Sequence, residues 1–187
     1  MKRGAEMAKI ILVASGKGGA GKSTVSALLG EAFASKKHPA LLVELDSGLR
    51  SLDVALGVSE NILFDMGDII RGSCEIRDAV LPCPFCEGLS LIPAAAKPVT
   101  VTSGILRKII AELSADFEYI ILDCPAGIGG ALENAAECTD LALVVATRIL
   151  PPSAEQDPQA LCFLPQESAN AGLLLSGARR RQKIFRP

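Results

Sequence analysis

Aromatic side chains are scarce in this sequence. They make up 4% of its 187 residues, with no tryptophan and a single tyrosine. Apolar residues nevertheless account for 49% of the chain, so the core must be aliphatic. Cores rich in Val, Ile, Leu and Ala are typical of α/β proteins, and a chain of this length suits one domain.

A strong charge of either sign and a long apolar run are also lacking. The formal net charge is −2 and the pI is about 5.5, which leaves no general basic surface for nucleic acid or anionic lipid. No apolar run approaches the roughly 18 residues of a membrane-spanning helix, and the N-terminus lacks the long apolar core of a secretory signal. We therefore expect a soluble cytoplasmic protein that does not bind nucleic acid.

Metal-ligand patterns are sparse as well. Of six cysteines, only Cys83 and Cys86 have motif spacing, and His38 is the single histidine. A structural zinc site needs four ligands, and no second pair with suitable spacing is present. A thioredoxin-like motif opens a helix, whereas this one precedes a strand. The pattern favours two loop cysteines over a metal site or a redox dithiol.

A glycine-rich segment carries the clearest chemical signal. Gly16–Ser23 fits the P-loop pattern, with an apolar strand at Ile10–Ala14 before it and helical spacing from Lys22 to Ser35 after it. Glycines let successive backbone N–H groups point at phosphate oxygens, and the helix N-terminus favours an anion. Lys22 can reach the β- and γ-phosphates, and the Ser23 hydroxyl can ligate Mg²⁺. The segment therefore predicts binding of a nucleoside triphosphate with magnesium.

Carboxylates follow two of the other apolar runs. Asp123 ends such a run and can hold the magnesium directly or through water, and Gly127 can face the γ-phosphate with its backbone N–H. Asp46 follows an earlier run and can orient, or accept a proton from, an attacking water. Glu44, two residues before it, is a second candidate.

Strand and helix patterns alternate along the chain. The expected strands are Ile10–Ala14, Ala40–Glu44, Leu89–Pro93, Tyr119–Leu122 and Leu141–Ala146. The expected helices lie at about 22–35, 64–70, 105–113 and 132–136, with a short one within 49–58. This alternation predicts an α/β protein with a P-loop NTPase fold, a mostly parallel sheet flanked by helices on both faces. The loops after the strands then meet at one edge, which brings the three chemical signals together.

The chain divides into three parts by composition. Residues 1–6 precede a second methionine, and we interpret them as a non-native or disordered extension. Residues 7–147 form the expected P-loop domain. Residues 148–187 hold five of the eleven prolines, lose the strand–helix period and end in basic residues, so we expect a divergent, poorly ordered tail.

Three segments together resemble the MinD/ParA family of ATPases. They are the deviant Walker A motif Ser15–Thr24, the stretch Gly48–Asp53 and the switch segment Asp123–Gly127. The likeness covers about residues 7–147 and points to the MinD branch. It implies an ATPase that sandwiches two ATP molecules, each with Mg²⁺, between two subunits.

The resemblance also implies roles for single residues. Lys17 is the signature lysine that reaches into the partner subunit's site, Lys22 holds the phosphates and Asp46 the attacking water, so these three are the expected catalytic residues. Ser23 and Asp123 are the expected metal ligands. The expected nucleotide-binding set is Gly16, Lys17, Gly18, Gly19, Ala20, Gly21, Lys22, Ser23, Thr24 and Gly127.

The implied biology is placement of the division septum. The resemblance implies a homodimer that forms on ATP binding, attaches to the inner face of the cell membrane and meets MinC-like and MinE-like regulators. No clear membrane-targeting helix is visible in the sequence. Glu44 and Cys124 replace the Asp and Ser that are usual in the family, and the family's C-terminal parts have no match after residue 147. We therefore expect a domain that is incomplete relative to the family, from a truncated or frameshifted product.

Two alternatives remain open at this stage. One is a truncated interaction module with impaired nucleotide binding. The other is an iron–sulfur carrier of the Mrp type that uses Cys83 and Cys86 across a dimer.

Overall fold

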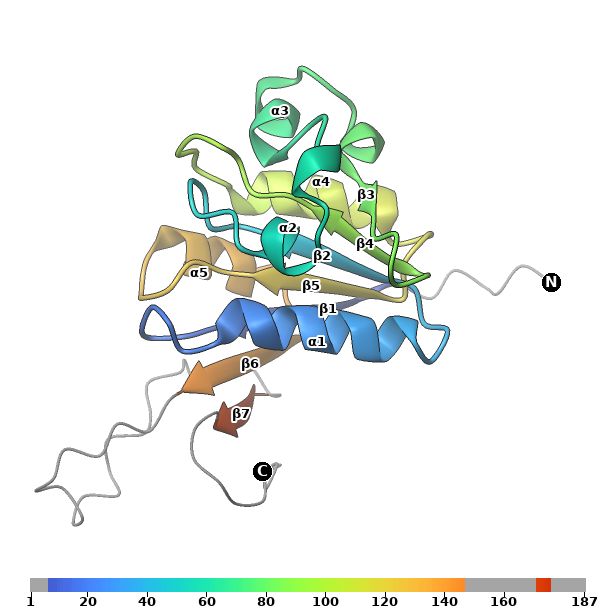
Figure 1. The fold of residues 1–187 in the computed structure, drawn as a ribbon. Helices are drawn as coiled ribbons and strands as arrows, with labels where there is room; N and C mark the ends of the chain where they lie inside the picture. The colour runs from blue at the N-terminus through green and yellow to red at the C-terminus, as the bar shows by residue number, and fades with distance from the viewer. Residues whose placement is uncertain (1–6, 147–170, 176–187) are drawn as a thin grey trace, which may run out of the picture.

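The sheet at the centre of the molecule places the P-loop at the carboxyl end of one of its strands. A computed structural model of the chain describes residues 7–146 and 171–175 (Figure 1). Within them, seven strands form one sheet in the order β3-β4-β2-β5-β1-β6-β7. The strands are β1 (Lys9–Ala14), β2 (Ala40–Glu44), β3 (Leu81–Pro82), β4 (Leu89–Ile92), β5 (Tyr119–Asp123), β6 (Leu141–Ala146) and β7 (Ala171–Leu175). Neighbours pair in parallel, except that β3 runs antiparallel to β4.

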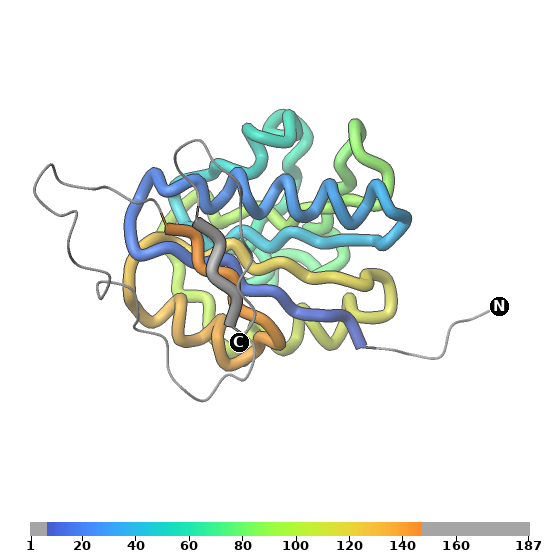
Figure 2. The backbone as a smooth tube through the Cα atoms, turned by 90° about the horizontal axis from the view of Figure 1, so that it is seen from below, coloured from blue at the N-terminus to red at the C-terminus, as the bar shows by residue number. Residues whose placement is uncertain are grey.

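Helices cover both faces of the sheet. They are α1 (Lys22–Ala34), α2 (Leu52–Ala55), α3 (Met66–Arg71), α4 (Ser103–Leu113) and α5 (Gly130–Ala136), with 3₁₀ turns η1 (Ser59–Asn61) and η2 (Ile76–Ala79). Side chains alternate between the faces of β1: Ile10 and Leu12 belong to the core cluster with α3, α4 and α5, whereas Ile11 and Val13 belong to the cluster with α1 and α2. Figure 2 shows α1 on one side of the strands and α4 and α5 on the other. The strands β1, β2, β4 and β5 are thus buried on both faces, which explains their continuous apolar runs.

The expected fold class is confirmed: the sheet is mostly parallel and carries helices on both faces. Predicted boundaries shift by a few residues where capping decides them. Helix α3 begins at Met66 rather than Phe64, because the Asp65 carboxylate accepts hydrogen bonds from the backbone N–H groups of Gly67 and Asp68. Strand β3 was not predicted, because two residues are too few to show a period.

Strand β7 lies in the segment for which the sequence predicts a poorly ordered tail. Its backbone pairs in parallel with β6, from Ala142 opposite Ala171 to Ala146 opposite Leu175. The rest of residues 148–187, and the N-terminal residues 1–6, lie outside the described part of the chain. The predictions for those segments therefore stay predictions.

The carboxyl ends of β1, β5 and β2 lie level with one another. Asp123 at the end of β5 is in register with Val13 of β1 on one side and with Glu44 of β2 on the other. The loop after β1 and the two strand-end carboxylates therefore meet at one edge of the sheet, as expected for α/β proteins. No helix in the described part of the chain has the length and hydrophobicity needed to cross a bilayer.

Candidate functional site

The P-loop connects the end of β1 to the start of α1. Gly19 (φ 74°) and Gly21 (φ 86°) adopt the left-handed backbone that strains any residue with a side chain. Gly21 is the N-cap of α1, and no side chain of the described residues caps that helix end. Gly16, Lys17, Gly18 and Gly19 are exposed to solvent, Ala20 is buried and Thr24 is exposed on α1. The loop thus offers an accessible helix N-terminus, which is an arrangement suited to an anion.

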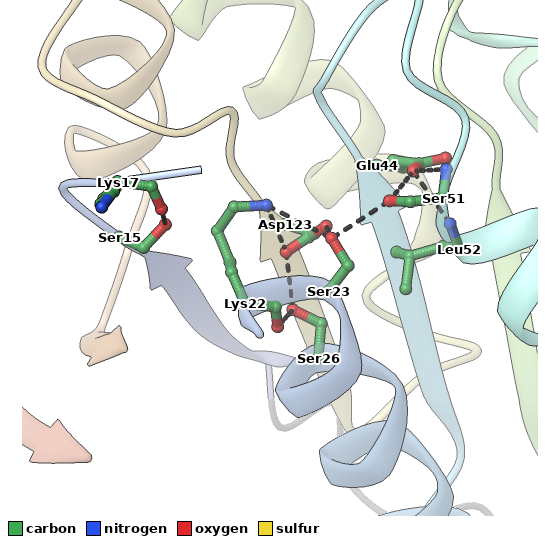
Figure 3. A network of polar contacts seen from close by, with 9 residues as sticks. All are labelled: Ser15, Lys17, Lys22, Ser23, Ser26, Glu44, Ser51, Leu52 and Asp123. Carbon is green, nitrogen blue, oxygen red and sulfur yellow. Dashed lines mark hydrogen bonds and ion pairs between the residues drawn. The ribbon is translucent and has the colours of Figure 1, made fainter. Parts of the chain in front are cut away.

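Asp123 gathers three side chains from the first turns of α1 (Figure 3). Its Oδ1 atom lies 3.2 Å from Lys22 Nζ and accepts a hydrogen bond from Ser26 Oγ at 2.8 Å. Its Oδ2 atom accepts a hydrogen bond from Ser23 Oγ at 2.7 Å. Asp123 is fully buried and Lys22 is 8% exposed, so the two charges compensate each other away from water.

These oxygen atoms suit a magnesium ion. Mg²⁺ prefers oxygen ligands and is commonly held by one or two protein groups together with phosphate oxygens and water. Ser23 Oγ and Asp123 Oδ2 are 2.7 Å apart at the helix N-terminus, where the phosphates are expected. Among the described residues no group of three or more His, Cys, Asp or Glu side chains is arranged to hold a metal by itself. The donor set therefore fits a cation bound together with a nucleotide.

Glu44 forms a second polar centre beside Asp123 (Figure 3). Its Oε1 atom accepts hydrogen bonds from Ser51 N at 2.7 Å, Ser51 Oγ at 2.9 Å and Leu52 N at 3.0 Å. Its Oε2 atom accepts a longer one from Ala94 N at 3.4 Å. Burial raises the pKa of Glu44, and the hydrogen bonds from Ser51 and Leu52 oppose that rise. Ser51 Oγ also lies 3.1 Å from Ser23 Oγ, so the two centres are connected.

Asp46 lies two residues beyond Glu44 and is half-buried. Burial raises its pKa, the charge of Lys22 lowers it and the charge of Asp123 raises it. These three effects place Asp46 within electrostatic reach of the Lys22–Asp123 pair. A carboxylate with a raised pKa is a better proton acceptor than an exposed aspartate.

Two predicted site residues lie apart from this cluster. Lys17 is exposed, and Figure 3 shows its side chain directed away from Lys22 and Asp123. The N–H of Gly127 (φ 100°) donates to the carbonyl oxygen of Ser15 at 2.9 Å. That N–H is therefore engaged by the protein in this structure, and the contact of Gly127 with a γ-phosphate stays a prediction.

Two residues of the cluster were missed by sequence reasoning. Ser26 is buried and contacts Asp123, and its spacing of four residues from Lys22 on a helix was an available signal. Ser51 links Glu44 to Ser23 from the loop before α2, and it lies within the stretch Gly48–Asp53 that carries the family resemblance, although no pattern of residue types singled it out.

The cysteine pair lies away from the nucleotide edge. Cys83, Cys86 and Phe85 line a surface groove together with Glu31 of α1 and Leu56, which follows α2. A second groove lies between α3, η2 and α4. Burial raises the pKa of Cys83 to about 11, which disfavours the thiolate that metal binding and dithiol chemistry require.

Comparison with known proteins agrees with this geometry. The family described as an AAA domain matches residues 8–150. The septum site-determining protein MinD of Bacillus subtilis is 37% identical over 167 residues, which cover 88% of this chain and 62% of that protein. Residues 1–147 make up less than 88% of the chain. An alignment that covers 88% of it therefore extends beyond residue 147.

Solved structures give the same result. MinD in the MinC:MinD cell division complex of Aquifex aeolicus superposes with a TM-score of 0.67 at 33% identity, covering 75% of this chain and 57% of that one. MinD of Pyrococcus horikoshii, solved with Mg-ADP, superposes with a TM-score of 0.63 at 26% identity, covering 75% and 58%. The chain thus spans about 60% of the length of these relatives.

Proposed function

Since the chain belongs to the AAA-domain family, within its MinD/ParA group of P-loop ATPases, we propose that it binds ATP with Mg²⁺ and hydrolyses it as an ATP-dependent dimer. The observation that carries this proposal is the contact of Lys22 and Ser23 with Asp123 at the N-terminus of α1. A cation, a hydroxyl and a carboxylate at an open P-loop are the groups that phosphoryl transfer uses.

The reaction is in-line attack of water on the γ-phosphorus, giving ADP and inorganic phosphate. Lys22 binds the β- and γ-phosphates and offsets the charge that develops on the transferred group. Ser23 and Asp123 would hold Mg²⁺, which would supply further charge neutralisation at the phosphates. Asp46 orients the water and accepts its proton, a role that the raised pKa of its carboxyl supports. Lys17, which is exposed on the loop, reaches the γ-phosphate of the ATP molecule bound by the partner subunit.

The cellular role that we propose is division-site selection. The relatives are septum site-determining proteins, and one of the solved neighbours is a MinC:MinD complex. By this reasoning the dimer acts in the cytoplasm at the inner face of the membrane, with regulators of the MinC and MinE kinds as partners. The relatives are longer than this chain, so these partners are part of the proposal.

The test is calorimetric titration of the full chain with Mg-ATP. Wild type should bind, and Lys22→Ala should lose binding at least about a hundredfold, because the phosphate-binding cation is gone. Lys36→Ala, a change of an exposed lysine just after α1, is the matched control and should bind like wild type. Absence of binding in the folded wild type would refute the proposal and favour an interaction module that does not use nucleotide.

A further inference from the structure

Glu44 has no part in the phosphate chemistry described so far, although it is fully buried at the same edge. Three of its four hydrogen bonds come from Ser51 and Leu52 and converge on a single oxygen, Oε1. They fix the carboxylate at the start of α2. The hydroxyl of Ser51 is therefore held between a buried carboxylate and the expected metal ligand Ser23.

Hydrogen counting limits what these hydroxyls can do together. The Ser51 hydroxyl has one hydrogen, yet acceptors lie on both sides of it: Glu44 Oε1 at 2.9 Å and Ser23 Oγ at 3.1 Å. The Ser23 hydroxyl also has one hydrogen, which it donates to Asp123 Oδ2 at 2.7 Å in this structure. The order Glu44–Ser51–Ser23–Asp123 is thus a chain of two hydroxyls with a carboxylate at each end (Figure 3).

A cation at Ser23 would select one arrangement of this chain. It needs a lone pair of Ser23 Oγ and competes for the Asp123 oxygen that now accepts the Ser23 hydrogen. The Ser23 hydrogen then has another acceptor within reach, the oxygen of Ser51. Ser51 can accept it and still donate its own hydrogen to Glu44, so no donor or acceptor is left without a partner.

We propose that Ser51 and Glu44 are positioning residues for the divalent cation. On metal binding, the Ser23 hydroxyl turns from Asp123 to Ser51, and Ser51 donates to Glu44. The chain then ends in a negative charge, which increases the electron density on Ser23 Oγ and frees Asp123 Oδ2 for the metal. This inference rests on the proposed function and adds residues that act through Ser23.

The test separates metal dependence from nucleotide affinity. ADP binding is titrated by calorimetry with Mg²⁺ and again with EDTA, for wild type, Ser51→Ala, Ser51→Thr and the control Ser59→Ala in the exposed turn η1. The readout is the ratio of the two dissociation constants. Ser51→Ala should lower the gain from Mg²⁺ by about tenfold, as removal of an outer-sphere hydrogen bond does at other metal sites, and should leave metal-free affinity nearly unchanged. Ser51→Thr, which keeps the hydroxyl, should behave like wild type.

Glu44→Gln, which removes the charge at the end of the chain, should reproduce the loss seen in Ser51→Ala. If Glu44→Gln does not fold, the exposed Ser51 variants decide. An unchanged gain from Mg²⁺ in Ser51→Ala would overturn the inference while leaving the proposed function intact. If folded wild type bound no ADP under either condition, both would fail.

Discussion

Lys22 and Asp123 form a buried ion pair across the mouth of the P-loop, with Nζ 3.2 Å from Oδ1. In this structure the carboxylate of Asp123 offers Lys22 the negative charge that a bound phosphate would otherwise offer. A nucleotide must therefore draw Lys22 away from Asp123, and a cation beside Asp123 then restores the charge balance there. Phosphate and metal binding should consequently be coupled, since each compensates for what the other displaces.

Replacing Asp123 by Asn leaves the buried Lys22 ammonium without its partner charge. Removing one partner of a buried pair costs about 3–5 kcal/mol, so we expect the free energy of unfolding to fall by about that amount. Urea unfolding followed by circular dichroism measures it. Asp116→Asn removes the exposed partner of Arg77, a pair 2.7 Å apart, and should cost less than about 1 kcal/mol. Equal losses in the two variants would contradict the burial argument.

Burial of Glu44 predicts a pH dependence of stability. Its pKa is raised above the ordinary 4.5, so the folded state binds the proton more tightly than the unfolded state. The resulting stability is present at low pH and is lost as pH rises from 4.5 through the raised pKa. The variant Glu44→Gln has no such charge and does not lose this stability. Its free energy of unfolding should therefore rise relative to that of wild type over that pH range. Urea unfolding at a series of pH values tests this, and a constant difference would argue against a raised pKa.

Thiol reactivity should follow burial. Burial raises the pKa of Cys83 to about 11 and that of Cys124 to about 12, so little thiolate is present at pH 8 in the folded protein. We expect iodoacetamide to modify the half-buried Cys74, Cys86 and Cys138 before the buried Cys83 and Cys124, as mapped by peptide mass spectrometry. In urea all six cysteines of the chain should react. Modification of Cys83 as fast as Cys86 in the native protein would be the contrary result.

Lys17 should affect dimerisation and turnover rather than nucleotide binding to one subunit. It is exposed and has no place in the Asp123 cluster, so Lys17→Ala should keep the ADP affinity of wild type. A charge supplied across a subunit interface contributes about a thousandfold to phosphoryl transfer, and turnover should fall accordingly. Light scattering with Mg-ATP and phosphate release are the measurements, with Lys36→Ala as control. Full turnover in Lys17→Ala would remove the partner-directed role.

The position of the site could be predicted from sequence because its signals are local. Gly16–Ser23 carries its own pattern between a strand and a helix, and Asp123 directly ends an apolar run. Parallel strands place their carboxyl ends at one edge, so two distant segments could be brought together without coordinates.

The partners of those residues depend on tertiary structure. Ser51 contacts Ser23 across 28 residues, and the contact exists only because the segment after β2 folds back over Glu44. Nothing in the composition of that segment specifies its path. The helical spacing from Lys22 could have indicated Ser26. Its partner Asp123 is 97 residues away, however, and could not be inferred from the helix alone.

Strand β3 has a consequence for how molecules of this chain meet at high concentration. It ends one side of the sheet with two residues, Leu81 and Pro82, and runs antiparallel to β4. Proline has no N–H to donate, and so short a strand offers little backbone to a strand from another molecule. The sheet is therefore protected at this edge against the edge-to-edge aggregation to which long apolar strands are prone.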